Sequence, residues 1–286
     1  MALKMYQKSE NPPLSTNTNV IGIAAGKGGV GKSSVTVNLA LALKRMGFTV
    51  GVMDTDIYGP SIRKMLPENR LPSQKGQVIV PALCEGIRMI SMAYFRQENE
   101  AAVVRAPIAN GVITQFIKQV EWGSPDYLLI DFPPGTGDIQ LTLCQQANLS
   151  GALMVTTPQE VAVMDVRKAM HMFHQVKTPI LGIVENMSYY YHQKTDEKLY
   201  IFGKGGGERL ALESGVPYLG GIPLDPTLCR SGDLGQSLFS QDPENCTPVV
   251  QAFMSIAGRL VQQVSALKSA AQDGLSNFEL KWKEMT

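Results

Sequence analysis

Residues 26–33 constrain the fold of this chain more than any other segment, because they read Gly-Lys-Gly-Gly-Val-Gly-Lys-Ser. An apolar run at residues 20–25 precedes them, and a helical pattern begins at Lys32. In a strand, turn and helix of this order, glycines let successive backbone N–H groups curl around phosphate oxygens. The positive end of the helix dipole adds to the attraction. The segment therefore predicts an α/β domain with a phosphate-binding loop, rather than a glycine turn that only caps a helix.

Short apolar runs alternate with helical patterns along the rest of the chain. The runs are continuous, which is typical of parallel strands covered on both faces. We therefore predict an α/β three-layer sandwich, a mostly parallel sheet with helices on both faces, of the P-loop NTPase type. The expected strands are residues 20–25, 49–54, 127–131, 152–157, 180–186 and 218–222. The expected helices are residues 32–46, 108–120, 138–147, 159–176, 208–214 and 248–267, and an added hairpin is expected at residues 77–92.

The length of 286 residues allows one large domain or two small ones, and the unbroken alternation favours one. We expect residues 1–18 to be a flexible leader, because they are polar and contain an Asn-Pro-Pro breaker. Residues 19–268 are the expected P-loop domain. Residues 269–286 are the expected C-terminal tail, which we interpret as a frayed end in preference to a docking segment or a membrane contact.

The formal net charge is only +1, so no global field recruits nucleic acid or an acidic membrane, and we expect neither as a partner. No apolar run approaches the roughly 20 residues of a membrane span, and the first ten residues lack the core of a signal peptide. The expected compartment is the cytoplasm. The four cysteines are far apart, without a Cys-x-x-Cys pair, and buried reduced thiols are the favoured interpretation.

The loop predicts how a nucleotide's phosphates and their metal ion would be bound. Lys32 is expected to contact the β- and γ-phosphates, and the Ser33 hydroxyl is expected to ligate Mg²⁺. No Asn-Lys-x-Asp guanine signature occurs, which favours adenine and hence ATP. The expected phosphate-binding residues are Gly26, Lys27, Gly28, Gly29, Val30, Gly31, Lys32, Ser33 and Ser34.

Polar residues at the ends of three other expected strands are candidates for the same site, because the carboxyl ends of parallel strands meet at one edge. Asp131 ends an apolar strand and is expected to hold Mg²⁺, through a bound water. Asp56 lies just beyond Asp54 and is placed to orient an attacking water, although it could equally cap a helix at residues 61–65. Asn186 could bond an adenine edge or be a buried amide at a strand end.

The second lysine of the loop, Lys27, makes it resemble the deviant Walker A motif of the MinD, ParA and nitrogenase iron-protein group. Further motifs look like those of the Mrp/ApbC family. They lie at residues 54–61, 104–107, 126–138, 157–159, 185–189, 201–207 and 222–225. The resemblance implies an ATPase that carries or assembles iron–sulfur clusters, works as a homodimer, and meets apoproteins or assembly proteins.

The resemblance also implies roles for individual residues. Lys27 would reach across the dimer to the partner's nucleotide, and Asp56 would support hydrolysis, so Lys27, Lys32 and Asp56 are the expected catalytic residues. Asn186 matches the adenine contact of the group. The alternative is a nucleotide-switched dimer of the MinD/ParA type, which needs the same nucleotide site and no cluster.

One departure from the Mrp/ApbC pattern concerns the cluster itself. The family usually carries Cys-x-x-Cys shortly after Glu-Asn-Met-Ser, whereas this chain has His192 and Thr195 there. Thr is not a useful iron ligand, because clusters are held mainly by thiolates. We therefore expect the usual cluster ligands to be absent and the nucleotide site to be intact. His171 and His174 have a chelating spacing, but without a third ligand we expect packing or surface roles.

Overall fold

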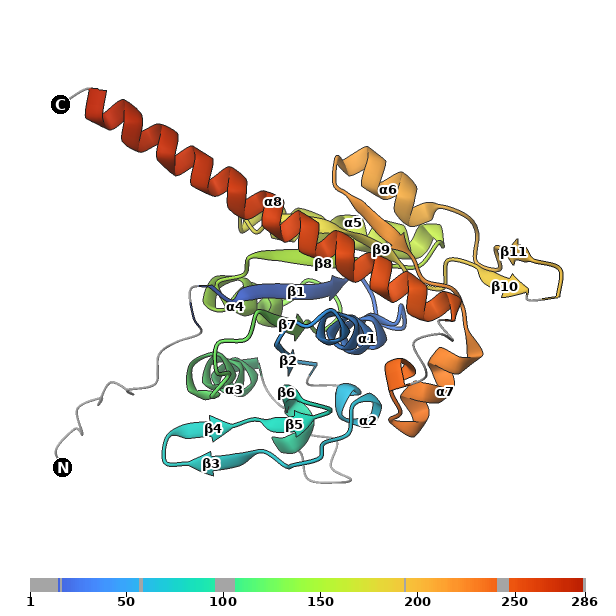
Figure 1. The fold of residues 1–286 in the computed structure, drawn as a ribbon, viewed down its shortest axis with the longest axis horizontal. Coiled ribbons are helices and arrows are strands. Elements are labelled where there is room, and N and C mark those ends of the chain that lie inside the picture. Colours follow the sequence, from blue (N-terminus) through green and yellow to red (C-terminus); the bar gives the residue numbers. More distant parts are fainter. Residues whose placement is uncertain are drawn as a thin grey trace.

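The computed structural model describes residues 15, 17–56, 59–95, 106–192, 194–240 and 247–284. Its centre is an eight-stranded sheet of order β12-β9-β8-β1-β7-β2-β6-β5, in which β5 alone runs antiparallel to its neighbour (Figure 1). The sheet strands are β1 (Asn19–Ala25), β2 (Val50–Asp54), β5 (Ala82–Cys84), β6 (Ile87–Ser91), β7 (Tyr127–Asp131), β8 (Gly151–Thr156), β9 (Ile180–Glu185) and β12 (Tyr218–Gly221).

Helices and two small hairpins surround this sheet (Figure 1). The hairpins pair β3 (Ser73–Lys75) with β4 (Val78–Val80) and β10 (Tyr190–His192) with β11 (Glu197–Leu199). The helices are α1 (Lys32–Arg45), α2 (Ile62–Met65), α3 (Ala106–Gln119), α4 (Asp138–Gln146), α5 (Glu160–Gln175), α6 (Gly206–Ser214), α7 (Pro226–Leu234) and α8 (Pro248–Glu284), with short 3-10 turns at Met92–Phe95 and Leu238–Ser240.

Two hydrophobic clusters cover the two faces of the sheet, as a three-layer sandwich requires. Alternate residues of each strand enter opposite clusters: Ile21 and Ile23 of β1 pack with α1 and α8, whereas Val20 and Ala24 pack with α3, α4, α5 and α6. Because both faces are buried, the central strands are apolar along most of their length. The predicted α/β fold class is confirmed.

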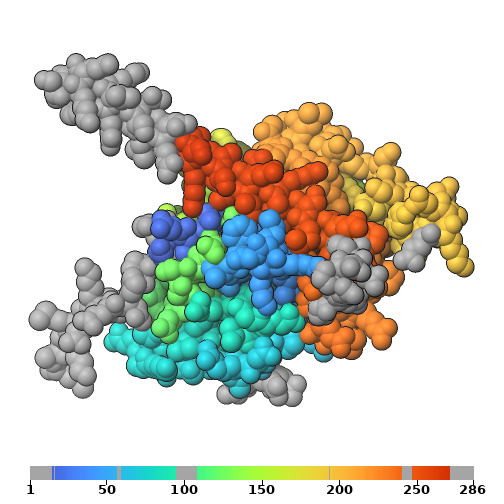
Figure 2. Space-filling model, viewed as in Figure 1, coloured from blue at the N-terminus to red at the C-terminus, as the bar shows by residue number. Residues whose placement is uncertain are grey.

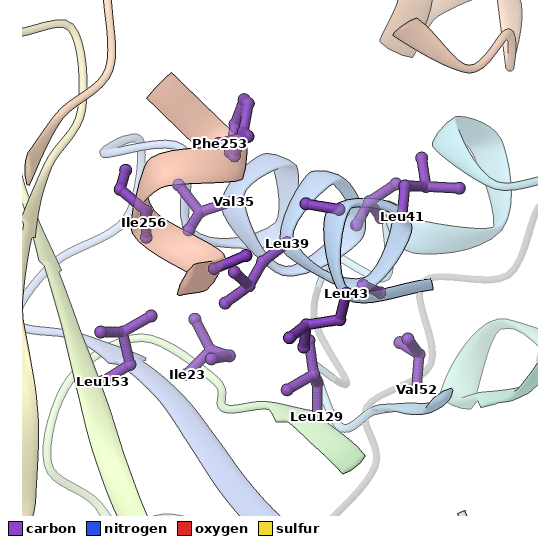
Figure 3. Packing of buried hydrophobic residues seen from close by; sticks show 14 of the residues in the cluster. Ile23, Val35, Leu39, Leu41, Leu43, Val52, Leu129, Leu153, Phe253 and Ile256 are labelled. Atoms are coloured by element: carbon purple, nitrogen blue, oxygen red, sulfur yellow. The ribbon is translucent and has the colours of Figure 1, made fainter. Parts of the chain in front are cut away.

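Helix α1 is packed so that its first turn is fixed relative to the sheet. Leu39 of α1 lies between Ile23 of β1 and the α8 residues Phe253 and Ile256 (Figure 3). All four side chains are at most 1% exposed. A first turn held in this way presents the preceding loop in one geometry, which is the condition for a preformed binding site.

Most predicted strand and helix ends agree with the structure to within two residues, and the differences lie toward the edges of the sheet. The expected hairpin at residues 77–92 contains β5 and β6, but β6 also joins the sheet parallel to β2. Helix α7 and the β10–β11 hairpin were not predicted. Helix α8 continues to Glu284, 17 residues beyond the expected end at 267.

The domain limits remain a prediction. Most of the expected leader, and the motif residues 104–105, lie outside the described residues. The expected tail at 269–286 is helical as far as Glu284. Among the described residues, no helix combines the length and the apolar character needed to cross a membrane.

Candidate nucleotide site

The loop between β1 and α1 has a backbone that only glycine adopts easily. Gly29 and Gly31 have φ of 81° and 83°, in the left-handed region. A Cβ on Gly31 would lie 2.2 Å from Nδ2 of Asn186, and one on Gly26 would lie 2.1 Å from the Asp165 carbonyl carbon. A Cβ on Gly28 would meet nothing within 4 Å. Gly26 and Gly31 therefore fix the loop against the protein, while Gly28 leaves its outer side open.

A cavity of about 240 Å³ lies on that open side. Eight of the nine expected phosphate-binding residues line it; Gly26 is the exception, because it packs against α5. The lining residues are Lys27, Gly28, Gly29, Val30, Gly31, Lys32, Ser33, Ser34, Asp56, Gly59, Ser61 and Pro134.

Asp131, at the end of β7, is the centre of the polar contacts behind the loop. Its Oδ2 lies 2.7 Å from Nζ of Lys32 and accepts a hydrogen bond of 2.7 Å from the Ser33 hydroxyl. Its Oδ1 accepts a bond of 2.6 Å from the Thr36 hydroxyl. Asp131 is fully buried and Lys32 is 7% exposed, so the pair is shielded from solvent. Lys32, Ser33 and Asp131 thus meet as expected, and sequence reasoning missed Thr36.

The oxygen atoms gathered here suit a magnesium ion. The Ser33 hydroxyl and the Asp131 carboxylate are hard oxygen donors 2.7 Å apart, which is the chemistry that Mg²⁺ prefers. The Lys32 ammonium beside them carries the charge that phosphate oxygens need. The donor set therefore fits a nucleotide with its metal ion.

Asp54 is a second buried carboxyl next to Asp131; it ends an expected strand, but the sequence favoured Asp56 for a role in the site. The register of β2 and β7 places Asp54 opposite Asp131. Burial, and then the charge of Asp131, raise the pKa of Asp54 to about 7, against bonds from the Ser91 hydroxyl at 2.7 Å and the Asp56 N–H at 3.1 Å. Asp54 therefore carries a proton for part of the time near neutral pH.

Asp56 lies at the mouth of the same cavity, half-buried, and accepts a bond of 3.1 Å from the Gly59 N–H. The N-cap position of α2 is Ser61, so Asp56 does not cap that helix. Lys27 also lines the cavity from the loop, partly exposed. The structure therefore brings both residues to the site, and their catalytic roles remain predictions.

Asn186, just beyond β9, contacts the loop from behind. Its Nδ2 donates to the Val30 carbonyl at 2.9 Å, its backbone N–H donates to Thr156 O at 2.8 Å, and its side chain is buried. This is the buried strand-end amide that was one of the two expectations. Its contact with adenine remains a prediction.

His192 and Thr195 lie on the β10–β11 hairpin, with His192 Nδ1 2.9 Å from Thr195 Oγ1. Within the described part of the chain, no group of three or more His, Cys, Asp or Glu residues is arranged to hold a metal.

Cys84 is buried, and burial raises the pKa of its thiol to about 12. Cys229 is exposed, which differs from the expected burial, and its Sγ lies 3.8 Å from Asp233. Cys246 lies outside the described residues.

The parallel sheet and the glycine loop at the end of β1 together define a P-loop NTPase. A family model described as ParA: NUBPL iron-transfer P-loop NTPase matches residues 16–261. The chain belongs to this family, which confirms the resemblance to iron–sulfur carrier ATPases.

Named relatives agree with this assignment. The chain is 44% identical to the iron-sulfur cluster carrier protein of Synechocystis sp., over 86% of this chain and 71% of that protein. It is 40% identical to the carrier protein of the same name from Pyrococcus horikoshii, over 87% of each. It is 42% identical to the chloroplastic Fe-S cluster assembly factor HCF101 of Arabidopsis thaliana, over 89% of this chain and 47% of that protein.

Solved structures agree as well. A nucleotide-binding protein from Archaeoglobus fulgidus, in complex with ADP, has a TM-score of 0.69 and 38% identity over 78% of this chain and 89% of that one. MinD of Aquifex aeolicus has a TM-score of 0.61 at 23% identity, over 86% of this chain and 97% of that one. At that identity the likeness to MinD concerns the fold alone.

Proposed function

We propose that this protein is a Mg²⁺-dependent ATPase that acts in assembling iron–sulfur clusters or transferring them to apoproteins, or in a derived role without the usual cluster ligands. The observation that carries the proposal is the convergence of Lys32, Ser33 and Thr36 on the buried Asp131 behind the glycine loop. The relatives named as cluster carriers favour this function over a MinD/ParA-like switch.

In this proposal the chain's own groups bind and orient ATP. Loop N–H groups and Lys32 would contact the phosphates, while Ser33 and Asp131 would hold Mg²⁺, which offsets the charge that develops on the phosphoryl oxygens. Asp56 would orient the water that attacks the γ-phosphorus. The bond between that phosphorus and the oxygen bridging the β- and γ-phosphates would break, which releases ADP and phosphate. Lys27 would act on the partner's nucleotide in a homodimer.

ATP binding and turnover are tested by calorimetry and by phosphate release. Lys32→Ala should abolish binding, whereas Lys118→Ala, on the exposed surface of α3, should change neither property. Asp56→Asn should bind ATP normally and hydrolyse it at least about tenfold more slowly, since positioned acid–base groups contribute that much or more. Unchanged turnover in Asp56→Asn would refute its role.

The dimer is tested by mixing subunits. Lys27→Ala alone should lose hydrolysis, and adding a Lys32→Ala subunit that still carries Lys27 should restore turnover at the Lys27→Ala subunit's nucleotide. Failure of this rescue in heterodimers that are shown to form would refute the action of Lys27 across the dimer.

Cluster handling needs a separate experiment, because His192 and Thr195 replace the usual cysteines. The test is anaerobic reconstitution with iron and sulfide, followed by visible absorption and iron analysis. A stoichiometric cluster that transfers to an apo-ferredoxin would support the carrier role. Normal ATP turnover without any cluster would refute the carrier role and leave the ATPase.

We also propose action in the cytoplasm, because the described cysteines are free thiols, which persist in that compartment.

A further inference from the structure

A groove of about 880 Å³ lies beside β12, away from the nucleotide cavity, and none of its lining residues lines that cavity. It is bounded by α6, α8 and the β10–β11 hairpin, whose surfaces adjoin in Figure 2 in orange, red and yellow. Its lining includes Gly220 and Gly221 of β12 and the buried Leu219. Because β12 is the last strand of the sheet, its outer side has no strand partner among the described residues. Such an edge can accept an extended peptide as an added strand.

Two lysines in the groove are held by aromatic rings. Nζ of Lys198 lies 4.3 Å from the centre of the Tyr189 ring, and Nζ of Lys204 lies 4.9 Å from that of Tyr200. These cation–π contacts keep each ammonium near the groove. Both lysines are exposed, and neither forms an ion pair with any residue that the structure describes.

A third cation comes from α8 and reaches the sheet edge itself. Arg259 donates from Nη1 to the Leu219 carbonyl at 3.2 Å and, within the described ranges, has no carboxylate in ion-pair distance. Three cations, from β11, the loop before α6, and α8, therefore line one groove, and each is oriented by an aromatic ring or a backbone carbonyl. A guanidinium with donors left over is suited to a carboxylate.

The acids of the groove offset this charge only in part. Glu185 is 1% exposed, and its two oxygens accept bonds of 2.6 Å from the Ser188 hydroxyl and the Gly207 N–H. Its carboxylate is thus bonded to the start of α6, although Glu185 also lines the groove. Glu208 is the exposed acid of the lining, against three exposed cations.

We propose that this groove binds an acidic, extended segment of a partner protein, which lies along the edge of β12 with its carboxylates at Lys198, Lys204 and Arg259. The backbone at Gly220 and Gly221 would offer hydrogen bonds to the peptide beside the Leu219 carbonyl that Arg259 already bonds, and the cations would select acidic side chains. A single-stranded nucleic acid fits less well, because the lysines lie over the Tyr189 and Tyr200 rings on which bases would stack.

The test uses the full chain and fluorescein-labelled peptides of defined sequence, measured by fluorescence anisotropy. The probe Glu-Val-Glu-Thr-Glu-Val-Glu is compared with versions in which every Glu is Gln or Lys, and with a labelled oligothymidine. We expect the acidic peptide to bind about tenfold or more tightly than the Gln version, with affinity falling as salt rises. Equal binding of the acidic and Gln peptides, no binding, or tighter binding of oligothymidine would overturn the proposal.

Variants locate the binding site. Lys204→Glu with Arg259→Glu should weaken the acidic peptide about tenfold or more, because two attractions become repulsions. Lys118→Glu, the same charge change on the exposed surface of α3, should leave it unchanged. Backbone hydrogen exchange should slow at residues 218–221 when the peptide is added. Slower exchange only at other residues would refute binding along the edge of β12. ATP turnover should be normal in both variants, so this test is independent of the nucleotide site.

Discussion

Replacing Thr36 by Val removes one hydroxyl from the polar cluster behind the loop and leaves the side-chain shape almost unchanged. The hydroxyl has one proton and two acceptors in reach, Asp131 Oδ1 at 2.6 Å and Lys32 O at 3.1 Å. The shorter bond, to a buried carboxylate, is the one it makes. A hydrogen bond to a charged group contributes about 1.5–3 kcal/mol to stability. A methyl group cannot approach an oxygen to that distance, so Asp131 must also shift.

We therefore expect Thr36→Val to lower the free energy of unfolding by about 1.5–3 kcal/mol or more. For a domain of this size that corresponds to a fall in Tm of roughly 3–12 °C. Urea unfolding and thermal scans measure the two quantities. Because Asp131 and Lys32 would both be displaced, ATP affinity should fall in the same variant.

Two control variants separate the hydroxyl from other effects. Thr36→Ser keeps the hydroxyl and should retain most of the stability. Thr142→Val removes a hydroxyl on α4 that donates to a backbone carbonyl, Asp138 O, at 2.9 Å, and should cost no more than about 1 kcal/mol. The Thr36 hydroxyl has no such role if Thr36→Val is as stable as the wild type, or if Thr36→Ser loses as much stability as Thr36→Val.

Three further changes have definite expected outcomes. Gly31→Ala should lose nucleotide binding in calorimetry, because its Cβ would lie 2.2 Å from Asn186 at a φ of 83°, whereas Gly28→Ala should bind more nearly normally. Phe253→Ala should lower unfolding stability in urea by about 3–5 kcal/mol, as for a fully buried ring. The raised pKa of Asp54 means that the folded state keeps a proton on this carboxyl which the unfolded state has already released. The stability that this proton contributes is therefore lost as pH rises from about 4 to about 7. Asp54→Asn should therefore gain stability relative to wild type across that range, and a constant difference from pH 4 to 8 would refute this.

The central strands could be predicted from the sequence because their local signal is strong. Burial on both faces makes each a continuous apolar run, and the run at 127–131 coincides with β7. The loop residues followed from the same logic, since a strand, a glycine turn and a helix fix the positions of Lys32 and Ser33. The carboxyl ends of parallel strands share one edge, which is why Asp131 could be expected beside them.

The direct pairing of Asp54 with Asp131 and the role of Thr36 could not be identified in this way, because both depend on how distant segments pair. Strand β7 lies between β1 and β2 although it follows both in sequence, and this order sets Asp54 opposite Asp131. Thr36 lies one helical turn after Lys32, within an apolar helix, where its sequence context resembles core packing. No local pattern distinguishes a threonine that packs from one that binds a buried carboxylate.

The glycine-rich segment at residues 203–207 resembles the loop at residues 26–33 but has a different role. At the first loop the helix N-terminus borders an open cavity, whereas at α6 the Gly207 N–H donates to the Glu185 carboxylate at 2.6 Å. That carboxylate satisfies the helix end from within the protein, so the second segment is a turn into a helix and not a second phosphate loop. Glu185 and Asn186 are consecutive residues, and the second donates to Val30 O in the first loop. One strand end therefore contacts both the nucleotide loop and the helix beside the groove, and a displacement of that strand end changes a contact in each.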